Sequence, residues 1–235
     1  MGVVGRRLRW GRGVACAVPG WVLAIVAHAQ VSTTVGVESD YRYRGVSLSN
    51  SKPSPRLTLN YDASDRWYAG ASATRAAIAA SATSTQLIGY AGWVSDAVAG
   101  HSVEIGIDGS HFAGVSGYDF AEVYVGLLAS RWSARAYYAP DYYGRRVGVG
   151  YLEWNVHAPV NEQVRVFAHL GALAPWQGTT GNGGKARGDI SVGAGYVSNG
   201  WDLHLAGVAA TRGGPYPAVY AGRRAAVVAG ASFSF

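Results

Sequence analysis

Apolar and polar residues alternate along segments of about ten residues, and this alternation limits the fold more than any other feature of the sequence. From Val103 to Asp108, the valine and isoleucine side chains point to one face of an extended chain and the two carboxylates to the other. Such segments match the ~9–11 residues that a tilted strand needs to cross a bilayer, whereas strands of soluble sheets have a mode near ~5–6 residues. Twelve segments are predicted as strands: 31–42, 53–62, 66–77, 84–95, 101–112, 119–130, 131–140, 147–157, 163–174, 187–198, 201–211 and 225–235.

The connections between these segments separate two interpretations of the alternation. A soluble sheet would bury its apolar face, whereas a membrane barrel turns that face toward lipid. Short turns at 62–66, 96–100, 130–131, 158–162 and 199–200 alternate with generally longer connections at 43–52, 78–83, 113–118, 141–146, 175–186 and 212–224. Bacterial barrels sort their connections in this way, with tight periplasmic turns and longer external loops. We therefore expect an all-β fold, a closed antiparallel transmembrane β-barrel of about 12 strands with up-and-down topology.

Aromatic residues concentrate near the ends of the predicted strands. Tryptophans lie near the short turns, at Trp67, Trp93, Trp132, Trp154 and Trp201. Other aromatic residues lie near the opposite ends, at Tyr41, Tyr43, Phe112, Tyr138, Tyr142 and Tyr143. Because amphipathic rings favour the two headgroup layers of a bilayer, two aromatic belts are expected around the barrel.

The first 29 residues have the pattern of a cleaved secretory signal peptide. A basic segment with four arginines precedes an apolar run, and Ala27-His28-Ala29 fits the small-x-small cleavage site. The alternative is a membrane anchor, but the run is shorter than the ~20 residues of a spanning helix. We expect residues 1–29 to be removed during export through the inner membrane, and residues 30–235 to form the barrel domain in a bacterial outer membrane.

Removal of this segment changes the charge and the thiol content. The mature chain would keep 16 Lys and Arg against 14 Asp and Glu, so the net charge falls from +6 to +2. This balance does not predict nucleic-acid binding. The single cysteine, Cys16, would leave as well, so neither disulfides nor thiol chemistry are expected.

Alternation predicts which charged side chains face the lumen. An arginine facing lipid at the bilayer midplane would cost about 2–4 kcal/mol, so the charges are expected inside. The predicted pore-lining residues are Glu38, Asp40, Arg42, Arg44, Arg56, Glu104, Asp108, Glu122, Arg135, Glu153, Arg165 and Asp189, with His169, Asp202 and His204 as further inward candidates.

These charges support two interpretations. They either line a wet pore or pair with one another and fill the lumen. Barrels of ~8 strands are filled and those of ~16 leave a channel, so twelve strands lie between the two cases. Arg42 and Arg44 either bind an anionic solute near the mouth or pair with neighbouring acids, and pairing is favoured for them. A channel for small polar solutes or ions is the preferred function, and a closed structural or adhesive barrel is the alternative.

The sequence offers no set of residues typical of an enzyme. Ser110 and His111 are adjacent on a predicted strand, so their side chains point to opposite faces. The other histidines have neither a nucleophile motif nor metal-site spacing beside them, and the Gly-rich stretch 178–184 lacks the strand–helix context of a phosphate loop. We expect no catalytic residues, no metal site and no cofactor. A lipid hydrolase or protease is the less favoured alternative.

The predicted loops and the last residue suggest partners in the outer membrane. The loops are rich in basic residues, at Lys52, Arg145, Arg146, Lys185, Arg187, Arg212, Arg223 and Arg224. They could hold lipopolysaccharide phosphates or draw anions to the mouth. The chain ends on Phe235, and this terminal aromatic resembles the signal that the barrel-assembly machinery recognises.

One stretch resembles a known family. SDYRYRGVS at 39–47 is similar to the SDYRFRGIS stretch that opens the TorF-type porin family of proteobacteria. Looser matches follow in order at 122–127, 137–143, 151–153 and 168–171, and the likeness extends from about residue 31 to Phe235. The resemblance implies an outer-membrane porin without catalytic residues, and it does not transfer a solute. The chain departs from the family pattern in the Ala-rich stretch 69–82 and in the last loop.

Overall fold

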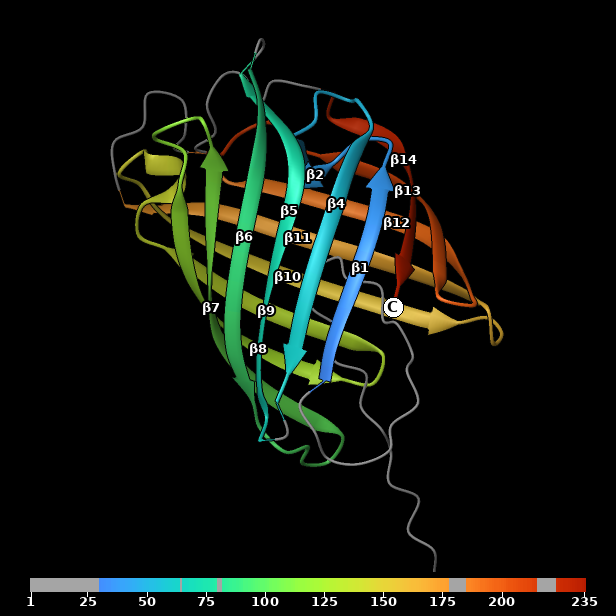
Figure 1. Cartoon of the computed structure of the whole chain (residues 1–235). Coiled ribbons are helices and arrows are strands. Elements are labelled where there is room, and N and C mark those ends of the chain that lie inside the picture. The colour runs from blue at the N-terminus through green and yellow to red at the C-terminus, as the bar shows by residue number, and fades with distance from the viewer. Residues whose placement is uncertain (1–29, 64, 80–81, 178–184, 215–222) are drawn as a thin grey trace, which may run out of the picture.

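The chain forms a closed antiparallel barrel of twelve long strands (Figure 1). The computed structural model describes residues 30–235 except 64, 80–81, 178–184 and 215–222, so the expected signal peptide lies outside the described residues. The wall consists of β1 (Gln30–Glu38), β4 (Ser54–Asp62), β5 (Trp67–Ala79), β6 (Ala82–Val94), β7 (His101–Ala113), β8 (Phe120–Ala129), β9 (Trp132–Ala139), β10 (Gly148–Pro159), β11 (Val164–Gln177), β12 (Arg187–Ser198), β13 (Trp201–Ala210) and β14 (Ala225–Ser234). Within the described residues, no helix is long and apolar enough to cross a bilayer.

Each wall strand pairs with its neighbours along the chain, and the first pairs with the last. In β1, Thr34 is the Cα partner of Ser234 on β14 and of Thr58 on β4, so the sheet has no free edge. The predicted closed up-and-down barrel is confirmed. The short turns gather at one end of the barrel, the turn end, and the longer connections gather at the other, the loop end, which is at the top of Figure 1.

Two predicted boundaries differ from the structure. The first strand was expected to run to residue 42 but ends at Glu38, and the chain then turns into the lumen. There it forms a small antiparallel pair, β2 (Arg42–Tyr43) and β3 (Val46–Ser47), which does not join the wall. The connection expected at 78–83 shrinks to residues 80–81, because β5 and β6 extend toward each other until Ala79 pairs with Ala82.

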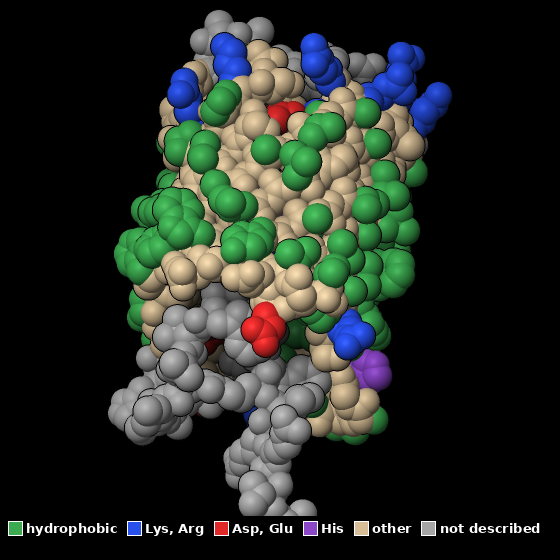
Figure 2. Space-filling view, turned by 90° about the vertical axis from the view of Figure 1, so that its right-hand side faces the viewer, with side chains coloured by type: hydrophobic (Ala, Val, Ile, Leu, Met, Phe, Trp, Pro, Cys, Tyr) green, Lys and Arg blue, Asp and Glu red, His purple; other side chains and the backbone are tan. Residues whose placement is uncertain are grey.

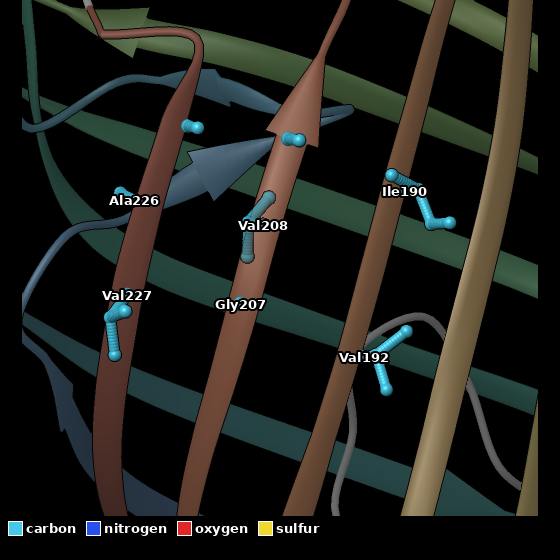
Figure 3. A pocket seen from close by; sticks show the side chains of 8 residues that line it. Ile190, Val192, Gly207, Val208, Ala226 and Val227 are labelled. Carbon is cyan, nitrogen blue, oxygen red and sulfur yellow. The ribbon is translucent and has the colours of Figure 1, made fainter.

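The outer face of the wall is apolar. Ile105, Val125 and Leu205 are each at least half exposed, although these side chains are normally buried in soluble proteins. Figure 2 shows hydrophobic side chains over the wall and Lys and Arg at the loop end. A shallow groove on this face, across β12, β13 and β14, is also apolar: Ile190, Val192 and Val227 line it beside Gly207 (Figure 3).

One aromatic belt is present, and the second was predicted wrongly. At the turn end, Trp67, Trp154 and Trp201 point outward and are about half exposed. At the loop end, however, five of the expected belt residues point inward. Tyr41, Phe112, Tyr142 and Tyr143 are at most 3% exposed, and Tyr43 packs against the same cluster. The cause is that Phe112 has inward parity on β7, whereas the four tyrosines lie in connections that fold into the lumen.

Glycines make room for large side chains inside the barrel. A Cβ atom at Gly92 would clash with the ring of Tyr68, and one at Gly106 would clash with the ring of Tyr124. In both cases the glycine and the tyrosine are Cα partners on adjacent strands. The inward rings therefore lie flat over glycine backbones of the neighbouring strand, which leaves space for polar groups across the lumen.

Candidate functional site

The lumen contains buried charged side chains that the wall strands bring together in ion pairs. Arg135 on β9 contacts two carboxylates: its Nε lies 2.6 Å from Oε2 of Glu104, and its Nη1 lies 3.3 Å from Oε1 of Glu153. Tyr68 donates a hydrogen bond to Glu104 at 2.5 Å, and Tyr137 donates one to Glu153 at 3.1 Å. This network crosses four wall strands, and its three charged side chains are at most 9% exposed.

Further pairs lie above and below this network. Arg165 binds Asp202 at 2.5 Å, and His169 Nε2 lies 2.9 Å from Asp189 Oδ1. His169 also contacts Asn155 through Nδ1 at 2.7 Å. Arg165 on β11 reaches past β12 to Asp202 on β13, whereas His169 and Asp189 lie on the adjacent strands β11 and β12. Both Arg165 and Asp189 therefore lie inside the barrel with ionisable partners.

Arg56 and Glu38 form a looser pair nearer to solvent. Their closest charged atoms are 3.6 Å apart, and each side chain is just over one fifth exposed. The Arg56 guanidinium also lies 4.8 Å from the ring centre of Tyr41. The pair therefore connects β1 and β4 and contacts the first residues of the segment that turns inward.

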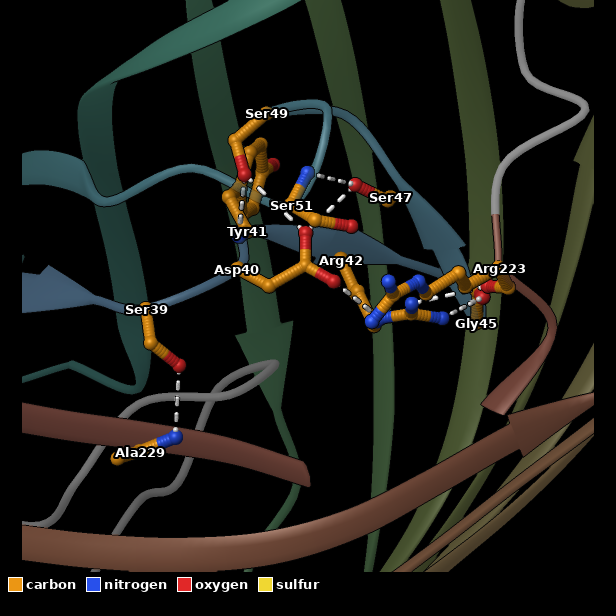
Figure 4. Close-up of polar contacts among 10 residues, drawn as sticks. All are labelled: Ser39, Asp40, Tyr41, Arg42, Gly45, Ser47, Ser49, Ser51, Arg223 and Ala229. Atoms are coloured by element: carbon orange, nitrogen blue, oxygen red, sulfur yellow. Dashed lines mark hydrogen bonds and ion pairs between the residues drawn. The ribbon is translucent and has the colours of Figure 1, made fainter. Parts of the chain in front are cut away.

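Residues 40–49 form a folded unit that we call the lumen hairpin. Asp40 holds it together: one carboxylate oxygen accepts hydrogen bonds from Ser47 and Ser49, and the other binds Arg42 Nε at 2.7 Å (Figure 4). The backbone N–H of Leu48 donates to the carbonyl of Tyr41 at 2.7 Å. Since Asp40 and Arg42 are almost fully buried, these bonds fix the hairpin from within.

Arg44, at the turn of the lumen hairpin, reaches a distant part of the wall. Its Nη1 and Nη2 donate to the two carboxylate oxygens of Glu122 at 2.9 and 2.5 Å. Glu122 lies on β8, which is five strands from β1 in one direction around the barrel and seven in the other. The hairpin therefore crosses the lumen from the wall at β1 and β4 to the opposite side.

Tyrosine rings surround the Arg44 guanidinium. Its central carbon lies 4.1 Å from the ring centre of Tyr151 and 5.2 Å from that of Tyr137, with Tyr43 and Tyr142 at 5.0 and 5.5 Å. Burial lowers the pKa of Arg44, but the Glu122 carboxylate, Tyr43 and Tyr142 together raise it more, so the pKa lies well above its ordinary value. Burial also raises the pKa of the Tyr43 phenol. Arg44 is thus a charged group held between a carboxylate and aromatic faces.

Asp108 differs from the other charged groups of the lumen. It is half-buried on β7, opposite Glu122 on β8 and Tyr90 on β6. Within the described part of the chain its carboxylate has no hydrogen bond and no ion pair, whereas the eleven other predicted lining residues have at least one. Asp108 and Glu122 therefore place two carboxylates side by side, with Arg44 as the cation bound to Glu122.

Not all of the predicted lining residues lie on wall strands. Of the first four, only Glu38 lies on β1, whereas Asp40, Arg42 and Arg44 belong to the lumen hairpin. The tyrosines around Arg44 were missed as site residues. A signal existed for two of them, because Tyr137 and Tyr151 have the same parity as Arg135 and Glu153 on their strands.

Solved structures similar to this barrel include porins. The NanC porin aligns with a TM-score of 0.61 at 14% identity, and the KdgM porin with 0.57 at 14% identity. A KdgM porin in complex with disordered oligogalacturonate aligns with 0.56 at 13% identity. Each alignment covers 87% of this chain and 99% of the other chain. At these identities the likeness establishes the fold alone.

Comparison by sequence identifies the family. No curated protein matches the chain. The family described as "Bacterial protein of unknown function (Gcw_chp)" matches residues 26–232, which include all wall strands from β1 to β13 and most of β14. The chain therefore belongs to the Gcw_chp family of bacterial proteins.

Proposed function

We propose that this protein is an outer-membrane channel of the porin type, through which small polar solutes or ions diffuse. The observation that carries the proposal is a closed wall with an apolar outer face and charged side chains inside. An apolar outer face with a tryptophan belt matches the hydrocarbon and headgroup layers of a bilayer. The inward charges give polar solutes a path that lipid does not, and the similarity to porin structures supports this function.

The proposal includes export to and assembly in the outer membrane. Residues 1–29 act as the cleaved signal peptide, and residues 30–235 form the inserted domain. The terminal Phe235, two-thirds exposed, would be offered to the barrel-assembly machinery. The TorF-type resemblance at 39–47 supports the same assignment.

Lipopolysaccharide is the proposed partner of the loop end. Exposed basic side chains gather there, at Lys52, Arg75, Arg145, Arg146, Lys185, Arg212, Arg223 and Arg224. Phosphate groups bind such side chains through charge-assisted hydrogen bonds. In the proposed orientation, the loop end faces the lipopolysaccharide leaflet, and the turn end faces the periplasm.

The test is conductance of the purified, folded protein in a planar lipid bilayer. Folding is checked by heat-modifiable migration in a gel. A channel gives discrete conductance steps, and the solute class follows from the reversal potential and from exclusion of neutral sugars of increasing size. Folded protein that never gives a step, in the native form or after removal of the lumen hairpin, contradicts the channel function.

A second candidate function is a closed structural or adhesive barrel. One specific observation favours it: Leu48, Tyr142 and Tyr143 are fully buried within the barrel at its loop end. In that case the lumen charges serve only to pair with one another, and the external loops carry the function.

A further inference from the structure

The lumen hairpin is part of an apolar cluster inside the barrel. Tyr41, Val46 and Leu48 of the hairpin are at most 3% exposed and belong to one cluster with Phe112 and Tyr142. Wall residues Val149, Tyr151 and Leu173 complete it. Side chains buried this completely leave no water-filled passage between them, so ions do not pass through the cluster in this conformation.

The hairpin has one set of bonds within itself and a separate set that attaches it to the wall. Internally, Asp40 binds Arg42, Ser47 and Ser49. Toward the wall, Tyr41 donates to Gln86 at 2.8 Å, and the carbonyl of Leu48 accepts from the backbone N–H of Ala77. At the far wall, Arg44 binds Glu122 through both charged nitrogens. The hairpin can therefore keep its own structure when its wall contacts break.

The attachment at the far wall decides whether the hairpin lies across the lumen. Gly45, at its tip, packs so closely against Asp189 and Ala210 that a Cβ atom there would lie 2.6 and 2.8 Å from their Cβ atoms. Both residues lie in the wall, on β12 and β13. The only ion pair between this tip and the wall in the described structure joins Arg44 to Glu122, and Tyr43 adds a hydrogen bond to the same carboxylate at 3.3 Å. Without it, the buried guanidinium would lose its counter-charge, and the hairpin position would be destabilised.

We propose that the lumen hairpin is a displaceable plug, and that the Arg44–Glu122 pair is the clamp that keeps the channel closed. This inference rests on the proposed channel function. Displacement of the hairpin removes Arg42 and Arg44 from the lumen and leaves Glu122 beside Asp108 without their cation. The open lumen therefore selects for cations.

The experiment compares single-channel records of the native protein, Arg44→Gln, Glu122→Gln and the double variant. Each variant breaks the clamp, so each is expected to raise the fraction of time in the conducting state at least tenfold, the change that corresponds to ~1.4 kcal/mol. The reversal potential separates the single variants: Glu122→Gln shifts it toward anions, whereas Arg44→Gln leaves it at the native value, because Arg44 has left the open lumen. If Arg44 lines the pore but does not hold the hairpin, Arg44→Gln shifts the reversal potential toward cations and leaves the open fraction unchanged.

Two further variants make each outcome decisive. Asp96→Asn breaks an exposed Arg–carboxylate pair between two short turns, Arg66–Asp96 at 2.6 Å, and should leave the open fraction at the native value. In the second, a short Gly-Ser linker replaces residues 40–49, and folding of every variant is checked by heat-modifiable migration. If the linker variant conducts and the clamp variants behave like the native protein, the clamp is wrong and the channel stands. If the folded linker variant is silent, the channel function falls as well.

Discussion

Arg135 is the side chain on which two buried carboxylates depend. Glu104 on β7 and Glu153 on β10 both contact it, and neither has another cationic partner in the described structure. Arg56 and Glu38 also form a pair, but both side chains are just over one fifth exposed and keep access to water. Because an uncompensated buried charge is much more costly than a hydrated one, the two arginines should differ in their effect on stability.

We therefore predict that Arg135→Gln destabilises the barrel much more than Arg56→Gln. Removing one partner of a buried pair costs about 3–5 kcal/mol, and partly exposed pairs contribute about 0–1 kcal/mol. The measurement is the denaturant midpoint of unfolding of the two variants in the same detergent. Equal midpoints would show that the lumen around Arg135 is hydrated, contrary to its burial.

Alternation predicted which residues point inward, but not which residues meet. Parity along a strand depends only on neighbouring residues, so the inward direction of Glu104, Glu122 and Arg135 could be read from the sequence. Arg44 and Glu122 are 78 residues apart, and their contact depends on a hairpin that leaves the strand pattern. The two-residue period continues through Asp40, Arg42 and Arg44, so the sequence pattern predicts that this segment continues the first strand.

At the scale of the strands, inward-facing glycines leave the space that large side chains of the adjacent strand occupy. On β6, a Cβ atom at Gly92 would clash with the Tyr68 ring and lie 2.8 Å from the carbonyl oxygen of Ile105. Gly89 on the same strand faces outward and has nothing within 4 Å of such an atom. The two positions form a matched pair for the same substitution.

We predict that Gly92→Ala destabilises the barrel by about 1–3 kcal/mol, the usual cost of overpacking, and that Gly89→Ala is neutral or slightly stabilising. The temperature at which heat-modifiable migration is lost measures both variants under the same conditions. A Gly92→Ala variant as stable as Gly89→Ala would mean that the Tyr68 ring can move away from the strand at little cost.

The wall strands were largely predictable because membrane-sized strands repeat one simple pattern. The segment predicted at 101–112 is β7, which ends one residue later, and the segment predicted at 187–198 coincides with β12. The aromatic residues near the loop end were not placed correctly, since a ring near a strand end suits either a headgroup layer or a buried cluster. Only the path of the connections decides between the two, and the sequence pattern does not specify that path.

At the scale of the whole molecule, the outer wall determines the solvent that the protein needs. Large apolar side chains are exposed around the barrel, including Ile107 at 59% and Val192 at 58%. In water, an apolar area of this extent would drive association between copies. In a bilayer, the same area meets hydrocarbon.

We predict that the chain from residue 30 to residue 235 stays monodisperse only in detergent or lipid. Size-exclusion chromatography before and after detergent removal is the measurement, and circular dichroism confirms that the strands persist. A folded, monodisperse barrel in plain buffer would contradict the membrane location. The Gly89→Ala variant serves as a control, since it changes the outer face by one methyl group.

Because the first connection folds into the lumen, most of its residues are shielded from molecules outside the barrel. The stretch that makes this chain most distinctive, residues 39–47, is held within the barrel, and most of its side chains are half-buried or buried. In the proposed outer-membrane orientation, antibodies and phage tails would meet the basic outer loops instead. If the plug proposal holds, residues 39–47 are constrained by their fit to the wall and not by such agents.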